Sequence, residues 1–179
     1  PYYLPEKVII SVNSNGYLPM SKNVVVDESL EQEGKYRWVN FPLIPTSDKV
    51  IVVDDQLHHL GDDHYTGSAN SQFQRSTEGL RYSKSFTIDE GQLEYSDAVL
   101  KITNKGAQDH PNPIALNGQN IGRLCCSPSG GSFATLRWEF DTNILKEGSN
   151  QITINSGYDN YNDDYDDFEF TDIMIELSE

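Results

Sequence analysis

The sequence predicts an all-β protein, an antiparallel β-sandwich, on three observations. Residues 135–140 alternate so that Leu136, Trp138 and Phe140 share one face and polar residues take the other, as a half-buried strand requires. Asn, Asp, Ser and Gly residues separate many such short segments, and ten Tyr and seven Phe suit strand surfaces. No long segment has the spacing of a helix.

The first half of the chain contains four segments that read as strands and one long polar loop. Apolar and β-branched residues predict strands at 7–12, 24–26 and 49–53. Residues 54–71 are polar, contain Gly and lack periodicity, so we expect a long loop, and such loops in compact β domains are usually functional or metal-bound. Residues 83–88 then predict a strand that enters the core.

A hairpin and a helical turn connect predicted strands of the second half. Asn117 and Gly118 stand between two short apolar runs, and this pair suits the positive φ angles of a type I′ turn. Residues 141–148 begin with a candidate cap, Asp141, and end with Gly148, which predicts one helical turn. Further strands are predicted at 98–103 and 151–154.

The last predicted strand, residues 168–177, changes face part-way along its length. Phe168 and Phe170 share one face, whereas the later apolar residues share the other. The sequence therefore predicts a β-bulge near Thr171 or Asp172.

Length and charge limit the class of protein. We expect a single compact domain overall, with residues 1–48 as N-terminal strands or an extension packed on a sandwich of residues 49–179. A net charge of −15 argues against nucleic acid and anionic membranes as partners. The chain has no apolar run long enough to cross a bilayer and no signal-peptide features at its start, so we expect a mature or excised piece. Cys125 and Cys126 are adjacent, so they cannot form an ordinary long-range disulfide; we expect two thiols on opposite faces of a strand, and a strained vicinal disulfide is the alternative.

The order of these pieces resembles the galactose-binding-domain-like superfamily over about residues 85–177. The resemblance rests on ALNGQNIG at 115–122, LRWEFD at 136–141, LKEGSN at 145–150 and the closing strand at 173–177. It implies a jelly-roll β-sandwich in which Gly118, Leu145, Gly148 and Asn150 are scaffold residues. Many members of this superfamily are noncatalytic carbohydrate-binding modules, and many hold a structural calcium. The resemblance therefore implies carbohydrate as a partner.

An acidic and aromatic segment at residues 156–167 is the strongest indication of a binding site. Its aspartates would repel one another in a folded loop, and a hard cation such as calcium is the commonest way to offset this. The segment does not fit the EF-hand template. The expected calcium ligands, with Asp62 or Asp63 as further candidates, are Asp163, Asp164, Asp166 and Asp167.

The tyrosines of the same segment offer flat apolar faces suited to stacking on sugar rings or to an interface. Sugar hydroxyl groups would be met by Asp and Asn oxygens or by calcium, and Arg and Asn side chains would donate hydrogen bonds. The predicted ligand-binding residues are Tyr158, Asn160, Tyr161 and Tyr165, with Arg123 and His64 as weaker candidates.

Histidines allow a competing interpretation, a zinc site. His58, His59 and His64 stand with several aspartates in the predicted loop of residues 54–71. Their spacing matches no recognised zinc pattern, and the segment looks too irregular to fix ligands, so we expect exposed loop histidines.

The sequence thus predicts an extracellular, noncatalytic, calcium-containing carbohydrate-binding module, secreted or on a cell surface. It is expected to be part of a larger multidomain protein and to prefer neutral glycans, because its acidic surface would repel anionic ones. An adhesion or spacer domain that binds a protein partner is the alternative. A glycan-active hydrolase or lyase is less favoured, because 28 acidic residues offer carboxylate pairs by chance and no Gly-x-Ser-x-Gly motif is present.

Overall fold

The computed structural model describes residues 7–13, 17–18, 20–25, 41, 43–44, 47–64, 73–126, 132–160 and 163–179. The chain divides into two compact units, Pro1–Ser47 and Asp48–Glu179. The first unit contains an antiparallel hairpin of β1 (Lys7–Val12) and β2 (Met20–Val25). The predicted strand at 7–12 is confirmed; of the one at 24–26, residues 24 and 25 form the end of β2, and Val26 lies outside the described residues.

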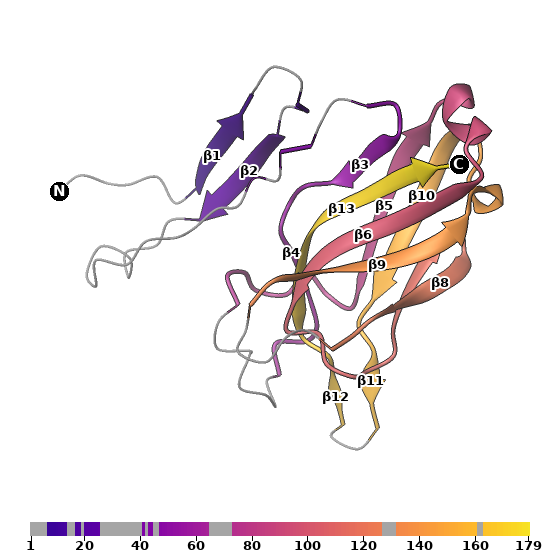
Figure 1. Cartoon of the computed structure of the whole chain (residues 1–179). Coiled ribbons are helices and arrows are strands. Elements are labelled where there is room, and N and C mark those ends of the chain that lie inside the picture. Colours follow the sequence, from indigo (N-terminus) through magenta and orange to yellow (C-terminus); the bar gives the residue numbers. More distant parts are fainter. Residues whose placement is uncertain are drawn as a thin grey trace. The chain divides into compact units, whose positions relative to one another are not determined.

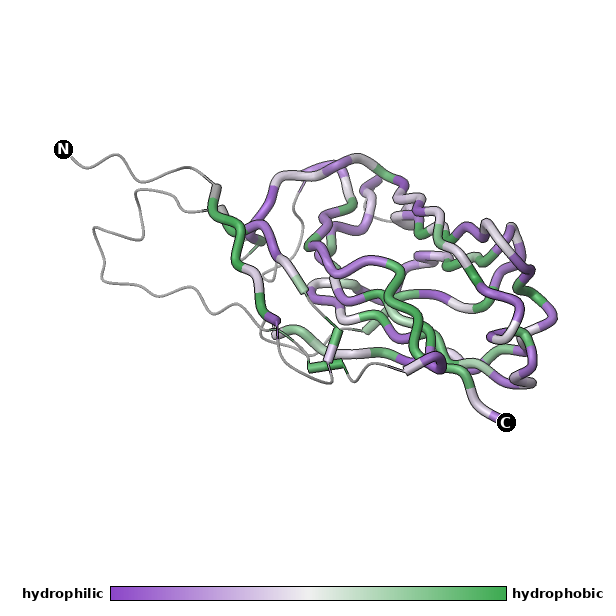
Figure 2. Tube along the Cα trace, turned by 90° about the horizontal axis from the view of Figure 1, so that it is seen from above, coloured by the Kyte–Doolittle hydropathy of each residue, from purple (hydrophilic) through white to green (hydrophobic). Residues whose placement is uncertain are grey.

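The second unit is an antiparallel sandwich of two sheets, which Figure 1 shows as two layers of strands. The four-stranded sheet has the order β5-β10-β7-β8. Along the trace, hydrophobic and hydrophilic positions alternate in short stretches (Figure 2), as expected for strands with one buried face. The strands of this sheet are β5 (Arg81–Ile88), β10 (Gly148–Asn155), β7 (Asn112–Leu116) and β8 (Gln119–Leu124).

The opposing sheet has the order β3-β13-β6-β9, and a short strand, β4, pairs with the first part of β13. Apolar residues from both sheets form one buried core, in which Leu100, Ile114, Ile152 and Phe170 are fully buried. The strands of this sheet are β3 (Val50–Asp54), β13 (Phe168–Ser178), β6 (Asp97–Lys105), β9 (Ala134–Asp141) and β4 (His58–Leu60).

Local signals of the sequence are confirmed at the turns. Asn117 and Gly118 have φ angles of 48° and 82°, the left-handed conformation that a type I′ turn needs between β7 and β8. Asp141 caps a short 3₁₀ helix, η3 (Thr142–Ile144), by accepting a hydrogen bond from the Asn143 N–H. A second 3₁₀ helix, η2, spans Glu90–Glu94.

The predicted bulge in the last strand is also confirmed. The pairing of β13 with β6 shifts between Thr171 and Met174, and Asp172 has a φ of 52°. The shift lets Phe168 and Ile173, which have opposite parity, both be fully buried.

Two predictions for the loops are wrong. Residues 54–71 are not one long loop, because β3 extends through Asp54 and β4 forms at His58–Leu60. The 156–167 segment is not a simple loop, because it carries a small hairpin of β11 (Tyr158–Asp159) and β12 (Asp164–Tyr165). Short polar strands of two or three residues give too little alternation to be seen in a sequence.

Candidate metal and ligand site

Strand β4 brings two acidic segments together that are about a hundred residues apart in the sequence. Leu60 pairs with Phe168 and His59 with Glu169, so the residues that follow β4 lie beside those that precede β13. The Asp63 N–H donates a hydrogen bond of 3.1 Å to Asp167 Oδ1 across this junction. The aspartates of both segments are therefore concentrated at one end of the sandwich.

Three carboxylates meet at this junction and form what we call the oxygen cluster: Asp62, Asp164 and Asp167. Each offers a carboxylate oxygen, and these three atoms lie within 4.8 Å of one another. Asp164 and Asp167 are buried, and Asp167 Oδ2 is buried without a hydrogen-bond partner. Opposite ligands of Ca²⁺ are about 4.6–5.2 Å apart, so the oxygen cluster fits one such ion. Asp167 Oδ2 is buried and lacks a hydrogen-bond donor, so a bound cation would offset the free-energy cost of burying it.

Gly61 allows the close approach of the two segments. Its φ of +142° lies in the region that favours glycine, and a Cβ there would lie 2.0 Å from Asp167 Oδ1 and 2.9 Å from its Cα. Only a residue without a side chain fits between the backbone and this carboxylate.

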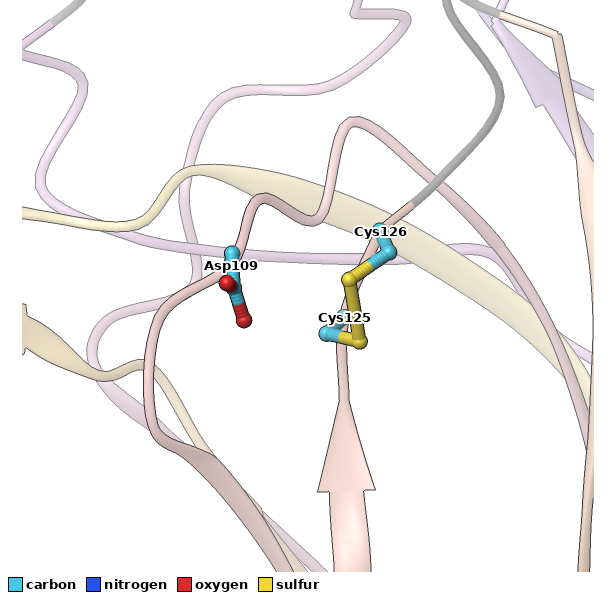
Figure 3. Close-up of side chains that lie close together, drawn as sticks. All are labelled: Asp109, Cys125 and Cys126. Atoms are coloured by element: carbon cyan, nitrogen blue, oxygen red, sulfur yellow. A yellow bond between two sulfur atoms is a disulfide. The ribbon is translucent and has the colours of Figure 1, made fainter.

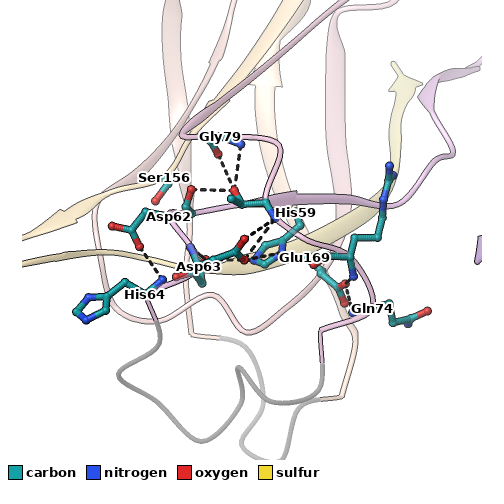
Figure 4. Close-up of polar contacts among 12 residues, drawn as sticks. His59, Asp62, Asp63, His64, Gln74, Gly79, Ser156 and Glu169 are labelled. Carbon is teal, nitrogen blue, oxygen red and sulfur yellow. Dashed lines mark hydrogen bonds and ion pairs between the residues drawn. The ribbon is translucent and has the colours of Figure 1, made fainter. Parts of the chain in front are cut away.

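A second set, which we call the imidazole cluster, shares one member with the first. It consists of His59, Asp63 and Asp167, whose ligand atoms also lie within 4.8 Å of one another. His59 is fully buried, and Figure 4 shows its ring among the acidic side chains at this junction. The expectation of exposed loop histidines is wrong for His59, because β4 places it in the sheet opposite Glu169.

Buried charges behind the imidazole cluster fix the segment that precedes β5. Glu169 is fully buried and accepts hydrogen bonds from the backbone N–H groups of Gln74 and Arg75. Lys105 Nζ lies 3.5 Å from the other Glu169 oxygen. This ion pair and the two backbone bonds compensate the cost of burying the carboxylate.

Asp166 has a separate structural role. Its Oδ2 accepts hydrogen bonds from Asn112 Nδ2 at 2.6 Å and from the Gln108 N–H at 3.0 Å, whereas its Oδ1 is buried without a partner. Burial raises the pKa of Asp166 to about 6, although the Asn112 bond opposes the shift. Ser156 donates a hydrogen bond to the Asp166 carbonyl oxygen, which ties the hairpin to the sandwich.

The hairpin of β11 and β12, which we call the tyrosine hairpin, projects from this end of the sandwich (Figure 1). Tyr158 is 38% exposed, and its ring lies 4.9 Å from that of the half-buried Tyr165 at an angle of 56°. The Tyr158 hydroxyl donates a hydrogen bond to the Asp163 carboxylate. Asn160 is exposed at the tip. Tyr161 lies outside the described residues.

The remaining predicted site residues are distributed unevenly. His64 has a side chain 70% exposed and Nδ1 3.3 Å from Asp164 Oδ1, so it stands beside the tyrosine hairpin. Arg123 instead forms a 2.8 Å ion pair with Asp109 at the end of β8. Of the four predicted metal ligands, the oxygen cluster contains Asp164 and Asp167, and it adds Asp62, which was a further candidate.

His58 belongs to a different network, on the opposite side of β4. Its Nδ1 lies 2.8 Å from Glu78 Oε2, and its Nε2 lies 3.3 Å from Asp54 Oδ2. Tyr82 donates a 2.6 Å hydrogen bond to the same Asp54 oxygen, and Lys84 Nζ is 3.0 Å from it. The Asp54 carboxylate thus joins β3 and the His58 imidazole of one sheet to β5 of the other.

The two cysteines form a disulfide with each other, so the prediction of two separate thiols is wrong. Strand β8 ends at Leu124, and Cys126 has a φ of 59°, so the pair does not follow the extended backbone that would place the sulfur atoms on opposite faces. Asp109 lies beside the disulfide (Figure 3). With both sulfur atoms joined, this group offers no thiolate to a metal.

These features define the class of protein as an all-β, antiparallel, sandwich-like protein with a cluster of buried carboxylates at one end. Comparisons with protein-family models, with curated proteins and with solved structures find no match. In the part of the chain that the structure describes, no helix is long and apolar enough to cross a membrane.

Proposed function

We propose that this chain is a noncatalytic carbohydrate-binding module of the galactose-binding-like type, with a jelly-roll arrangement of its strands. Its glycan site lies on the tyrosine hairpin, and a calcium ion in the oxygen cluster supports it. The observation that carries the proposal is the exposed ring of Tyr158, which packs on Tyr165 in the same hairpin that carries the buried Asp164 of the oxygen cluster. The resemblance over residues 85–177 supports the same class of fold.

The chemistry of the hairpin suits a sugar ligand. An exposed tyrosine ring presents an apolar face that stacks on the apolar side of a pyranose, and its edge can take part in hydrogen bonding. The neighbouring Tyr165 ring limits the motion of Tyr158, so less conformational entropy is lost when ligand binds. Asn160 and His64 add exposed polar groups near it. With a net charge of −15, the chain favours neutral glycans over anionic ones.

Calcium would act here through Asp62, Asp164 and Asp167. Asp164 belongs to β12 of the tyrosine hairpin, and Asp62 belongs to the segment after β4. An ion bound by both would fix the position of the hairpin on the sandwich. Glycan binding should then depend on calcium even where the sugar does not touch the ion.

The test is binding of the purified chain to a broad glycan array, run with millimolar calcium and with chelator. We expect binding to neutral glycans that weakens in chelator and is lost in Tyr158→Ala. Tyr95→Ala is the control, because Tyr95 precedes β6 at the opposite end of the sheet. Circular dichroism of each variant checks that the fold is retained.

The alternative is an adhesion or spacer domain, in which Tyr158 contacts a protein partner. If a well-folded sample binds no glycan on the array, either with calcium or with chelator, this alternative is favoured. The extracellular, secreted or cell-surface location belongs to the proposal in either case, since both functions act outside the cell.

A further inference from the structure

The imidazole cluster has a property that glycan binding does not explain. The His59 ring is fully buried and packs against the Phe73 ring, with centroids 4.6 Å apart. Its Nδ1 lies 2.6 Å from the carbonyl oxygen of Arg75. Because a carbonyl oxygen can only accept, Nδ1 carries the hydrogen. In the neutral ring, Nε2 is therefore left with a free lone pair.

The atom nearest to that lone pair is another acceptor. Asp167 Oδ1 lies 3.2 Å from His59 Nε2, yet the two atoms do not form a hydrogen bond. Asp167 Oδ1 already accepts from the Asp63 N–H, and Asp167 Oδ2 is buried without a donor. A positive charge between the buried imidazole nitrogen and the buried carboxylate, either a proton on Nε2 or a metal cation, would offset the cost of burying them.

We infer that the imidazole cluster, His59, Asp63 and Asp167, is a binding position for a transition cation of the Zn²⁺ class. Zinc binds imidazole nitrogen and carboxylate oxygen at about 2.0–2.2 Å, which separates two such ligands by about 3.3 Å in a tetrahedron. The 3.2 Å between His59 Nε2 and Asp167 Oδ1 agrees with this separation. This inference does not rest on the proposed glycan binding.

The surroundings of His59 match those of a metal-binding histidine. Such histidines donate their second ring N–H to a carbonyl or carboxylate, which fixes the tautomer and the ring plane. The Arg75 carbonyl has this role, and Glu169 holds the Arg75 backbone through its N–H. Asp63 Oδ1 lies 3.9 Å from the Nδ1 side of the ring and accepts a hydrogen bond from the Thr77 N–H, so Asp63 is a third ligand only after its side chain turns toward Nε2.

The two clusters should differ in the cation that they take. Nitrogen ligands favour zinc-class cations, whereas the all-oxygen set of Asp62, Asp164 and Asp167 favours calcium. Asp167 belongs to both sets, so both ions can bind together only if this carboxylate bridges them. Calcium and zinc are therefore expected to influence each other's affinity.

A proton is the natural competitor of zinc at Nε2. Zinc binds only deprotonated ligands, so its binding should release protons and weaken on acidification.

The test begins with the metal-free full chain, prepared with a chelator that is then removed. Calorimetric titration with Zn²⁺ in two buffers of different ionisation enthalpy measures stoichiometry, affinity and proton release. We expect one Zn²⁺ per chain with proton release, and a Co²⁺ absorption spectrum of a nitrogen- and oxygen-ligated site. Absence of stoichiometric binding would overturn the inference.

Two variants assign the site. His59→Gln should lower the zinc affinity by more than about 100-fold, since even loss of an outer-shell partner typically costs 10- to 100-fold. His58→Gln is the matched control, because its ring lies next along β4 and contacts Asp54 and Glu78 instead. Equal affinity of wild type and His59→Gln would overturn the proposal.

A measurement on the wild-type chain avoids dependence on a buried substitution. In a ¹H–¹⁵N correlation spectrum of the histidine rings, Zn²⁺ should shift the His59 Nε2 resonance and leave its Nδ1 protonated. An unchanged His59 ring at saturating Zn²⁺ would overturn the proposal, even if zinc binds elsewhere on the surface.

Discussion

Gly61 is the residue on which the contact between the two acidic segments depends. The backbone there passes so close to Asp167 that an added Cβ would lie 2.9 Å from the Asp167 Cα, where no rotamer change can relieve the clash. A single missing side chain thus decides whether the carboxylate reaches both clusters.

We expect Gly61→Ala to destabilise the fold and to abolish cation binding at Asp167. Its Cβ would displace the backbone of either segment, and overpacking of this kind typically costs about 1–3 kcal/mol, with a further contribution from the φ of +142°. The free energy of unfolding, measured with urea, tests this. Gly91→Ala is the control, because that glycine has no neighbour within 4 Å and no positive φ, and a similar loss in both variants would contradict the argument.

At the scale of elements, the β7–β8 turn is joined to the connection before β10 by one side chain. Asn117 Nδ2 donates to the Ile144 carbonyl and to Asn150 Oδ1, each at 2.8 Å. Its Oδ1 accepts from the Gln151 N–H at 3.0 Å. Asn117 therefore acts in the turn and also holds two connections together.

Asn117→Gly should separate these two roles. Glycine keeps the positive φ that the turn requires but removes all three side-chain hydrogen bonds, so we expect a loss of about 1–3 kcal/mol. Chemical denaturation would measure it. Asn120→Gly in the same hairpin is the comparison, since the Asn120 side chain bonds only to the nearby Gly122 N–H among the described contacts. Equal stability of Asn117→Gly and wild type would show that the turn alone matters.

The network around His58 makes the junction of β3, β4 and β5 sensitive to pH. Burial lowers the pKa of His58, but the Asp54 and Glu78 carboxylates raise it by more. The pKa of His58 in the folded state therefore lies above 6.5. A raised histidine pKa contributes stability that is complete below the unfolded value and is lost as pH rises through the folded value. The other charged or titratable groups at this junction are Arg75, Tyr82 and Lys84.

We therefore expect the stability advantage of wild type over His58→Gln to be largest near pH 6 and to shrink toward pH 9. Denaturation midpoints of both proteins across this range, with chelator present throughout, provide the measurement. A difference that stays constant with pH would mean that His58 acts by packing against Tyr82 and Phe170 and not by its charge.

For the whole molecule, the excess of acidic residues leads us to expect that cations stabilise the fold. Because the net charge is −15, the acidic side chains repel one another in the folded chain. This repulsion is concentrated where buried aspartates meet. A calcium ion that binds only the folded chain stabilises it by mass action, by about 2.7 kcal/mol at one hundred times its Kd.

Calcium should accordingly raise the melting temperature of the wild-type chain more than magnesium at the same concentration, since magnesium demands shorter bonds and octahedral geometry. Asp164→Asn should lose this difference. Glu147→Gln, which removes one negative charge from an exposed position, should retain it. Differential scanning calorimetry gives the melting temperatures, and equal shifts with both ions would indicate simple charge screening.

The sequence alone predicted the fold class, because its signals are local. The alternation in residues 135–140, the Asn117-Gly118 turn, the Asp141 cap and the bulge near Thr171 each depend on neighbours in the chain. The short strand β4 could not be predicted, since three residues, His58–Leu60, contain no period. The histidines were expected to be exposed for the same reason, and only His64 is.

What the sequence by itself determined is the antiparallel β class, the position of its turns and the concentration of acidic and aromatic residues near the C-terminus. Only the tertiary structure decided which of those residues act together. Pairing of β4 with β13 brought Asp62 to Asp164 and Asp167, and it buried His59 beside Asp63 and Asp167. The physical reason is that strand pairing joins residues about a hundred positions apart, and long-range pairing leaves no trace in the local pattern of either partner.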